Sequence, residues 1–418
     1  MLIDRPIYVD RIMLFRDTDL VKVVTGLRRC GKSSLLELVQ ARLLEEGIAP
    51  HQIASINLES RNPSITTDNE LYRYFKEKAH AAEARLYIFV DEVQRIEGWH
   101  DVINAMRVDF DCDIYVTGSN AFLLSSEIAT YLSGRYVETN VLPLSFSEYL
   151  DFCDLTFQPG SSAALSPRGD VITFEDVFDR YLRFGGMPAL ASLDTTQEQH
   201  FQYAKSLYDT VIARDVLNSE RHASQRKISD PDLLRRIADF LADNVGNLVS
   251  ASGIAKYLRS HDENVTDKTA SAYCKVLQDA YLFYECRRYD LRGKSLLKTN
   301  PKLYLSDLGM RSWLLGGKRS DIGRVFENAV YLQLQFEGYS VQVGKLYQKE
   351  VDFVAVHDDK RIYWQVADNV SAEETLEREL APLKAIRDAY PKKLLVRTGS
   401  PSQSVEGIEI VSARDFFC

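Results

Sequence analysis

Eight residues near the N-terminus have the types and spacing of a phosphate-binding loop. Residues 26–33 read Gly-Leu-Arg-Arg-Cys-Gly-Lys-Ser and fit the pattern G-x-x-x-x-G-K-S/T. Glycines let the backbone curl so that successive N–H groups face one anion, and the N-terminus of a following helix adds positive partial charge. Lys32 is expected to reach the β- and γ-phosphates of a nucleotide, and Ser33 to bind Mg²⁺ through its hydroxyl. The expected nucleotide contacts are Gly26, Leu27, Arg28, Arg29, Cys30, Gly31, Lys32, Ser33 and Ser34.

A second motif supplies two carboxylates. Five largely apolar residues, 86–90, precede Asp91 and Glu92, so a buried strand is expected to deliver both acids at its carboxyl end, where open α/β sheets bind ligands. Asp91 is expected to help hold Mg²⁺ and its waters, and Glu92 to orient and deprotonate the attacking water. Ordinary strands also end in solvated acids, but the upstream phosphate loop favours the catalytic interpretation.

The elements that must position these residues alternate along the first third of the chain. Apolar runs predict strands at 21–25, 53–58, 86–90, 114–117 and 136–142, and helical periods fall between them at 33–44, 71–82, 99–109 and 122–132. This alternation predicts an α/β fold with a parallel sheet covered on both faces.

With Thr117-Gly118-Ser119-Asn120 after the fourth strand, these motifs resemble an AAA+ ATPase. The resemblance implies a sheet in the order 5-1-4-3-2 and a polar sensor, Ser119 or Asn120, that positions the attacking water; the alternative is an ordinary turn or helix cap. Arg135 occupies the place where the superfamily often has an arginine finger, which would act in trans within a ring of subunits or in cis. The alternative is a surface arginine paired with an acid such as Glu138.

A closer resemblance covers most of the chain and is to bacterial and archaeal ATPases of the AAA_14 type with a C-terminal DUF4143 region. Its motifs are Gly26–Ser33, Val90–Gln94, Thr117–Ser119, Gly134-Arg135, Pro143–Phe146, Gly185–Pro188, Tyr208–Val216, Tyr304–Gly309 and Phe326–Asn328. The expected domains are an ATPase core at 1–157, a helical lid at 171–228, a winged helix at 229–315 and a C-terminal domain at 316–418. A Gly-, Ser- and Pro-rich linker, 158–170, follows the core.

The winged-helix expectation rests on three helical periods, at 231–244, 252–259 and 267–279, followed by strand-like residues at 282–289 and 302–305. The segment 286–302 carries six basic residues against one acid, on a chain whose net charge of −9 excludes a wholly basic coat. Such a wing is suited to a DNA backbone; the alternatives are a protein-contact module or a solvated hairpin. The DNA-contact candidates are Arg287, Arg288, Arg292, Lys294 and Lys298.

The last hundred residues resemble the PD-(D/E)xK nuclease fold. Glu327 and Asp352 match its two carboxylate positions, and Gln365-Val366-Ala367 lies where the E/Q-x-K motif is expected. Ala367 in place of the lysine removes the cation that would stabilise an attacking hydroxide. The expectation is therefore an inactive nuclease-like domain retained for structure, assembly or DNA contact.

The remaining residue types add little chemistry. The six cysteines and seven histidines show no metal spacing, no signal peptide or membrane span is expected, and the composition is that of a cytoplasmic globular protein. Cys30 is either a redox-sensitive thiol or a variable loop position. The sequence predicts a Mg²⁺-dependent ATPase whose hydrolysis of ATP moves a lid and winged helix on DNA; the alternatives are an ATP-dependent signalling switch on a protein partner and an ATP-regulated nuclease.

Overall fold

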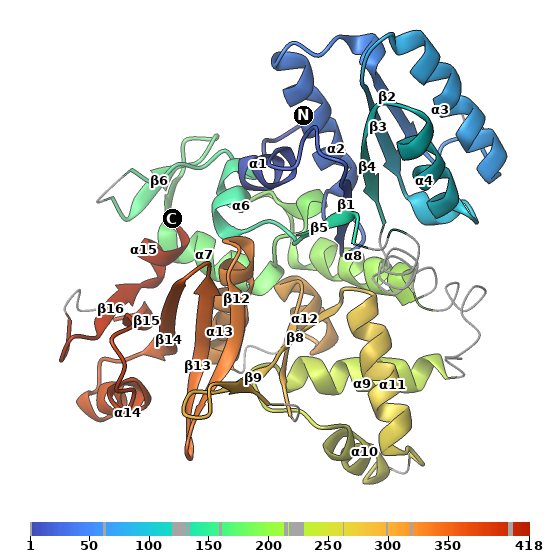
Figure 1. The fold of residues 1–418 in the computed structure, drawn as a ribbon. Coiled ribbons are helices and arrows are strands. Elements are labelled where there is room, and N and C mark those ends of the chain that lie inside the picture. Colours follow the sequence, from blue (N-terminus) through green and yellow to red (C-terminus); the bar gives the residue numbers. More distant parts are fainter. Residues whose placement is uncertain are drawn as a thin grey trace. The chain divides into compact units, whose positions relative to one another are not determined.

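The structure, a computed structural model, describes residues 2–61, 64–118, 132, 134–158, 161–212, 216, 230–261, 263–297, 300–317, 321–399 and 404–418. The chain divides into two compact units. One unit contains Met1–Leu142 with Asp279–Tyr281, and the other contains Pro143–Gln278 with Leu282–Cys418. Figure 1 shows both units coloured along the sequence.

A five-stranded parallel sheet forms the centre of the first unit. Its order is β2-β3-β4-β1-β5, which confirms the predicted order 5-1-4-3-2. The strands are β1 (Val21–Gly26), β2 (Ile53–Asn57), β3 (Leu86–Asp91), β4 (Cys112–Thr117) and β5 (Tyr136–Val141). The helices are α1 (Pro6–Met13), α2 (Lys32–Glu45), α3 (Asp68–Ala82) and α4 (Trp99–Asp109). The helix predicted at 122–132 lies almost wholly outside the described residues.

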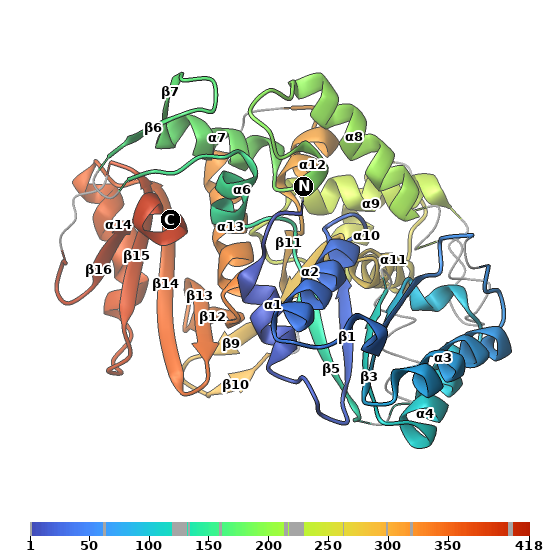
Figure 2. The same cartoon turned by 90° about the horizontal axis from the view of Figure 1, so that it is seen from above.

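Both faces of this sheet are covered, as the continuous apolar strands predict. On one face, alternate strand residues such as Val23 and Ile88 join a core with Phe75 of α3 and Trp99 of α4. The other alternate residues, including Phe89, face the opposite way, toward the side covered by α2, against which α1 packs (Figure 2). The strands therefore deliver their carboxyl ends at one rigid edge, which carries the phosphate loop and the two carboxylates.

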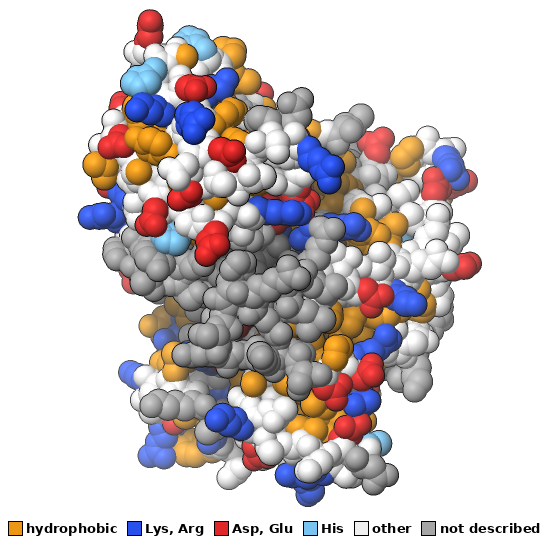
Figure 3. All heavy atoms as spheres, turned by 90° about the vertical axis from the view of Figure 1, so that its right-hand side faces the viewer, with side chains coloured by type: hydrophobic (Ala, Val, Ile, Leu, Met, Phe, Trp, Pro, Cys, Tyr) orange, Lys and Arg blue, Asp and Glu red, His pale blue; other side chains and the backbone are white. Residues whose placement is uncertain are grey.

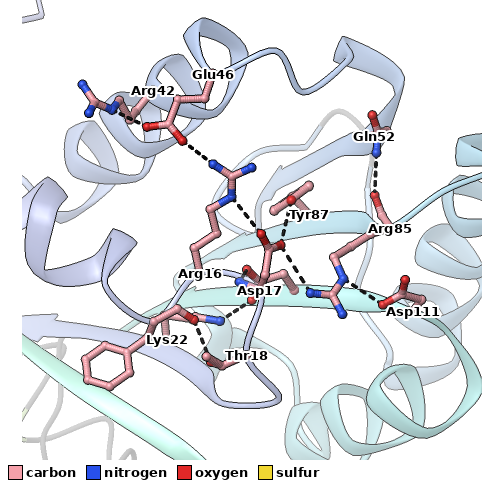
Figure 4. A network of polar contacts seen from close by, with 12 residues as sticks. Arg16, Asp17, Thr18, Lys22, Arg42, Glu46, Gln52, Arg85, Tyr87 and Asp111 are labelled. Carbon is pink, nitrogen blue, oxygen red and sulfur yellow. Dashed lines mark hydrogen bonds and ion pairs between the residues drawn. The ribbon is translucent and has the colours of Figure 1, made fainter.

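The opposite, amino edge of the sheet is fixed by a charged network (Figure 4). Asp17 accepts a hydrogen bond from Tyr87 Oη at 2.8 Å and pairs with Arg16 and Arg85 at 3.1 and 3.3 Å. Below them Lys22 pairs with Asp113 at the start of β4, and both side chains are buried. Ion pairs therefore stabilise this end of the sheet. It carries none of the residues predicted to bind nucleotide.

The second unit begins with helices and a two-stranded pair. Its helices up to residue 314 are α6 (Phe146–Phe152), α7 (Phe174–Phe184), α8 (Gln197–Thr210), α9 (Pro231–Asp243), α10 (Ala251–Arg259), α11 (Asp267–Asp279) and α12 (Leu308–Leu314). β6 (Ala163–Leu165) pairs with β7 (Val171–Thr173), and β8 (Phe283–Cys286) pairs antiparallel with β11 (Lys302–Leu305). The three predicted helices and the outer strands of the predicted hairpin are therefore present.

A seven-stranded sheet completes the second unit, in the order β10-β9-β12-β13-β14-β15-β16. Its strands are β9 (Arg288–Asp290), β10 (Ser295–Leu296), β12 (Ser340–Leu346), β13 (Lys349–His357), β14 (Lys360–Asn369), β15 (Lys392–Thr398) and β16 (Glu409–Ser412). The remaining helices are α13 (Ile322–Phe336), α14 (Glu373–Lys384) and α15 (Ala413–Phe417). Leu380 and Leu383 of α14 pack on one face, and Tyr331 of α13 packs near Phe353 on the other.

The predicted hairpin is present as the antiparallel pairs β8–β11 and β9–β10, and β9 also pairs with the C-terminal sheet. The single strand expected at 282–289 is divided at Arg287, because the chain leaves β8 and continues as β9 beside β12. The segment expected to project toward DNA thus forms the edge of the C-terminal sheet, with Val343 paired to Arg288.

Several motifs of the second unit form one structural junction. Gly186 N–H donates to buried Asp307 at 2.9 Å, and Gly186 O accepts from Leu144 N–H at 2.8 Å. A Cβ on Gly186 would lie 2.3 Å from Leu144 O, so only glycine fits this turn. The side chain of Asn328 exchanges two 2.9 Å hydrogen bonds with the backbone of Leu305. These motifs hold α6, α7, β11 and α13 together.

Candidate functional site

The phosphate loop connects β1 to α2. Gly26 has φ +134°, and a Cβ there would lie 2.2 Å from Val141 O, so the loop starts in a conformation that only glycine can adopt. Lys32 is 5% exposed, and its Nζ donates to the Gly26 and Leu27 carbonyl oxygens at 3.0 and 3.1 Å. The ammonium group therefore lies against the start of the loop, while Ser33 is exposed in the first turn of α2.

Buried contacts support the loop from behind. Arg5, 3% exposed, donates to Cys30 O at 3.0 Å and to Leu142 O at 3.1 Å. The Cys30 thiol donates to Val141 O at 3.2 Å, and burial raises its pKa, so the structural interpretation of Cys30 is favoured over a reactive thiol. Arg5 was not predicted, since nothing in the sequence links it to a loop 25 residues away.

A second support lies on the exposed side of the loop. Arg28 pairs with Glu59 at 3.0 Å, and Arg95 reaches the same carboxylate oxygen at 2.8 Å. The hydrogen bond from Arg95, together with the charge and hydrogen bond of Arg28, holds the pKa of Glu59 below its usual value, against the opposing effect of partial burial. Arg28, predicted as a nucleotide contact, is thus anchored beside the loop.

Thr117 connects the carboxylate of Asp91 to the backbone of Glu92. Its hydroxyl donates to Asp91 Oδ1 at 2.5 Å and accepts from the Glu92 N–H at 2.9 Å. Asn57 Nδ2 donates to the other Asp91 oxygen at 2.7 Å. Asp91 is 6% exposed and Thr117 fully buried. Strands β2, β3 and β4 therefore hold Asp91 in one orientation.

Glu92 lies where β3 ends and has a left-handed backbone, with φ 57°. Its Oε2 accepts a 2.6 Å hydrogen bond from Gln94 Nε2, so Gln94 contacts the predicted base. Thr117, Asn57 and Gln94 were missed because each acts through a neighbouring strand or turn. The signal available was only that polar residues end β2 and β4 beside the acids of β3.

Thr117→Val should reveal this positioning role. Valine has nearly the same shape but leaves the buried Glu92 N–H and one Asp91 oxygen without their partner. We expect ATP turnover to fall about 10-fold, and stability by about 1–3 kcal/mol, the cost of unsatisfied buried polar groups. Thr117→Ser should restore both. Steady-state kinetics and urea unfolding measure the two effects; equal turnover in the valine variant and the parent would contradict the assignment.

The remaining predicted catalytic residues have different outcomes. Ser119 and Asn120 lie outside the described residues. Arg135 is exposed at the amino end of β5, where its carbonyl accepts from Val21 N–H. Val21 pairs with Tyr136 and Gly26 with Val141, so about 17 Å of strand separates Arg135 from the phosphate loop. Arg135 is therefore not placed to act in cis.

The alternative partner of Arg135, Glu138, is engaged elsewhere. Its Oε1 accepts from Thr25 at 2.7 Å and from Tyr281 at 3.3 Å. No ion pair between Arg135 and Glu138 occurs in the described structure. The surface-pair interpretation with Glu138 is thus not supported.

The predicted DNA-contact residues lie on the edge of the C-terminal sheet rather than on a free hairpin. Arg287 pairs with Glu285 at 2.7 Å, and Arg292 lies 5.3 Å from the Tyr347 ring. Arg288 is half-buried, Lys294 is exposed, and Lys298 lies outside the described residues.

A polar groove flanks the helix α11. Two cavities of about 690 and 590 Å³ share Lys275, Gln278 and Glu285 in their linings. Lys268 and Ser271, two turns and one turn before Lys275 on the helix, line the first cavity, and both lysines are exposed. This groove brings the basic face of the predicted recognition helix together.

The predicted nuclease-like residues converge on an unexpected cation. Lys302 Nζ lies 2.9 Å from Glu327, 2.8 Å from Glu350 and 3.8 Å from Asp352, and its side chain is 3% exposed. Burial lowers the Lys302 pKa, but the three carboxylates outweigh it and raise that pKa above its usual value. Gln365 instead donates to Glu379 at 3.2 Å.

The expectation that this position lacks a cation is therefore wrong. The nuclease motif places its lysine on the strand after Asp352, and that position is Ala367. The cation found in the structure is Lys302 of β11, which the sequence analysis had counted with the basic segment 286–302. Among the residues that the structure describes, no group of three or more His, Cys, Asp or Glu side chains is arranged to hold a metal ion. Those residues also include no helix long and apolar enough to cross a membrane.

The parallel sheet, the phosphate loop after β1 and the acids after β3 define a P-loop protein of the AAA+ class. A family model described as an AAA domain (AAA_14) matches residues 18–150, and one described as a domain of unknown function (DUF8612) matches 175–321. An uncharacterized protein of Haemophilus influenzae is 36% identical over 416 residues, 99% of this chain and 98% of its own length. The chain belongs to the family of that protein, a family of AAA+ P-loop ATPases.

Other similarities are more distant. The uncharacterized protein MJ1544 of Methanocaldococcus jannaschii is 29% identical over 377 residues, 88% of this chain and 79% of its own length. Among solved structures, the Walker-type ATPase of Pyrococcus abyssi is 16% identical, with a TM-score of 0.49 over 75% of this chain and 95% of its own. Orc1 of Aeropyrum pernix in complex with DNA is 15% identical, with a TM-score of 0.29 over 75% of this chain and 92% of its own. Neither family model extends over residues 322–418.

Proposed function

We propose that this protein is a Mg²⁺-dependent ATPase that uses the phosphate loop and the carboxyl edge of its parallel sheet. The observation that carries the proposal is the Thr117 bridge, which holds Asp91 and Glu92 in fixed orientation at the sheet edge that also bears the loop. A surface acid pair would not need a buried hydroxyl between two strands. Binding of ATP draws Lys32 from the loop carbonyls to the β- and γ-phosphates.

The donor set suits magnesium. The Ser33 hydroxyl and the Asp91 carboxylate are hard oxygen ligands, and each Asp91 oxygen keeps a lone pair beyond its hydrogen bond to Thr117 or Asn57. Bound magnesium would neutralise charge on the phosphates. Glu92 would then take a proton from the attacking water, after its carboxylate is freed from Gln94.

The proposed role of Arg135 is that of an arginine finger acting in trans. Because it lies at the amino edge of the sheet, it would have to stabilise the transition state in the site of a neighbouring subunit. The active form would therefore be an oligomer, for which a ring is the arrangement that gives every site a finger. An Arg135→Ala subunit mixed with an Arg135-intact, Glu92→Gln subunit should recover turnover if the finger acts between subunits.

The partner that we propose is DNA, bound along the α11 groove. Lys268, Ser271, Lys275 and Gln278 place basic and hydrogen-bonding groups along one helix face. On the face drawn in Figure 3, Lys and Arg side chains are interspersed with Asp and Glu. The groove, rather than a wide basic coat, supports DNA binding on a chain with a net charge of −9.

The DNA proposal is tested with a double charge reversal, Lys268→Glu with Lys275→Glu. We expect single-stranded, duplex or branched DNA to stimulate the parent ATPase, and the variant to bind that DNA at least 10-fold more weakly with a shallower salt dependence. Lys76→Glu, an exposed change on α3, is the matched control. Unchanged binding in the double variant would remove the groove from the proposal.

The signalling-switch alternative has one observation in its favour. Both Lys32 and Glu92 are held by protein groups in this structure, so a slow, nucleotide-retaining state is also compatible with the site. Turnover that is slow and indifferent to DNA would favour the switch. A nuclease is less favoured, because Glu327 and Glu350 are already neutralised by Lys302. Nicking of plasmid DNA with Mg²⁺ or Mn²⁺, abolished by Asp352→Ala, would reinstate it.

A further inference from the structure

A cavity of about 480 Å³ lies within the second unit, lined by α7, α12, the start of α13 and the end of β15. Its walls are apolar where Leu182, Leu308 and Val325 contribute. Four arginines also line it, against two aspartates at α7. The volume is in the range of small-molecule sites, and the lining combines an apolar body with a positive end.

Arg311 of α12 is a buried cation in the wall of this cavity. The residue is 4% exposed, and its Nε donates to Ala242 O at 3.0 Å. Its Nη atoms have no hydrogen bond or ion pair with any residue that the structure describes. Burial lowers the Arg311 pKa, and the charges of Asp321 and Asp243 act in the opposite direction. A buried guanidinium with free Nη groups on a cavity wall is a recognition group for a planar anion.

The other arginines keep the cavity positive. Arg183 and Arg180 lie 5.1 and 5.2 Å from the ring of Phe184, on the same helix, and Arg183 has one bond, from Nη2 to Gln197. At the rim, Arg397 pairs with Asp179 at 2.9 Å and with Asp368 at 2.5 Å. The second aspartate, Asp176, accepts a hydrogen bond from Thr173 and is exposed.

We propose that this cavity binds a small amphipathic anion: an aromatic or aliphatic body against Leu182, Leu308 and Val325, with a carboxylate, sulfonate or phosphate paired to Arg311. The bidentate fork of Arg311 selects the anionic group, and Arg183 adds attraction from α7. None of the residues lining it belongs to the phosphate loop or to the acids of β3, so the site is separate from the ATPase chemistry. Occupation would stabilise the contact between α7 and α12.

The fluorescent aryl sulfonate 8-anilino-1-naphthalenesulfonate and its uncharged analogue N-phenyl-1-naphthylamine test this directly. Both have the same apolar body, and only the first has the anionic group. In titrations of the full-length protein we expect the sulfonate to bind more tightly than the amine. Arg311→Met should weaken sulfonate binding at least 10-fold, as expected for loss of a charge-assisted pair, and change amine binding less than twofold.

Two further variants keep the test decisive. Arg183→Met removes a half-buried arginine whose Nη2 donates a hydrogen bond to Gln197. This variant tests the site even if Arg311→Met fails to fold, and we expect sulfonate binding to weaken about threefold or more. Arg378→Met, on the exposed face of α14, is the control and should bind as the parent does. Equal binding of the two dyes to the parent, or parent-like sulfonate binding by both cavity variants, would overturn the proposal.

Discussion

Replacing Glu92 with glutamine is expected to lower the ATP turnover rate by about 100-fold or more and to leave ATP binding intact. Glutamine has the same size and can still accept the hydrogen bond from Gln94, so the local structure should persist. It cannot accept a proton from water, and general-base catalysis contributes about 10²–10⁴-fold. Phosphate release under saturating ATP measures turnover, and binding of a fluorescent ATP analogue measures affinity.

The control for this change is Glu97→Gln, a nearby exposed glutamate that neither β3 nor Thr117 positions. We expect parent-like turnover in that variant. If Glu92→Gln retained more than half of the parent rate, Glu92 would not be the base, and the assignment of the β3 carboxyl edge as the catalytic edge would have to be revised.

Replacing Lys302 with methionine should be among the most destabilising single changes in the second unit. Methionine fills a similar volume but leaves Glu327, Glu350 and Asp352 facing one another without a cation. Breaking a buried ion pair from one side costs about 3–5 kcal/mol. Urea unfolding should show a loss of this size. Lys384→Met, which breaks an exposed pair with Glu406, should cost under about 1 kcal/mol.

The Lys302→Met loss should also depend on pH. Burial and the neighbouring Glu327 already raise the Asp352 pKa, and without the Lys302 ammonium group this pKa would rise further. A carboxyl whose folded pKa exceeds its unfolded value stabilises the protein at low pH, and this stability is lost as pH rises through the folded value. The variant should therefore be closer to the parent at pH 5 than at pH 8. A pH-independent deficit, or one no larger than that of Lys384→Met, would contradict the cluster.

The sheet could be predicted because its signals are local. The apolar run 86–90 and the glycine loop at 26–33 each specify an element without knowledge of the remaining chain. The strand order then followed from the resemblance to AAA+ ATPases, and the structure has that order. By contrast, Thr117 and Asn57 acquire their role from pairing between β2, β3 and β4, which a single residue pattern does not encode.

The C-terminal half was harder to predict, because its decisive contacts also join residues that are distant in the sequence. Lys302 and Asp352 are close in space but far apart in the chain. The nuclease motif expects its lysine on the strand after Asp352, and Ala367 occupies that position. The basic segment after Cys286 was interpreted as a wing because it follows three helical periods and lies between two strand-like segments. In the structure its strands gain backbone hydrogen bonds at the edge of the C-terminal sheet, which the charge pattern cannot show.

The central claim is that a nucleoside triphosphate binds in the loop ahead of α2. Calorimetric titration of ATP with Mg²⁺ into the parent and into Lys32→Ala tests this claim most directly. Lys76→Ala, exposed on α3, serves as the matched lysine control. We predict saturable binding to the parent and to Lys76→Ala, and binding at least 10-fold weaker to Lys32→Ala. Absence of binding to the parent, or equal affinity in Lys32→Ala, would contradict the claim.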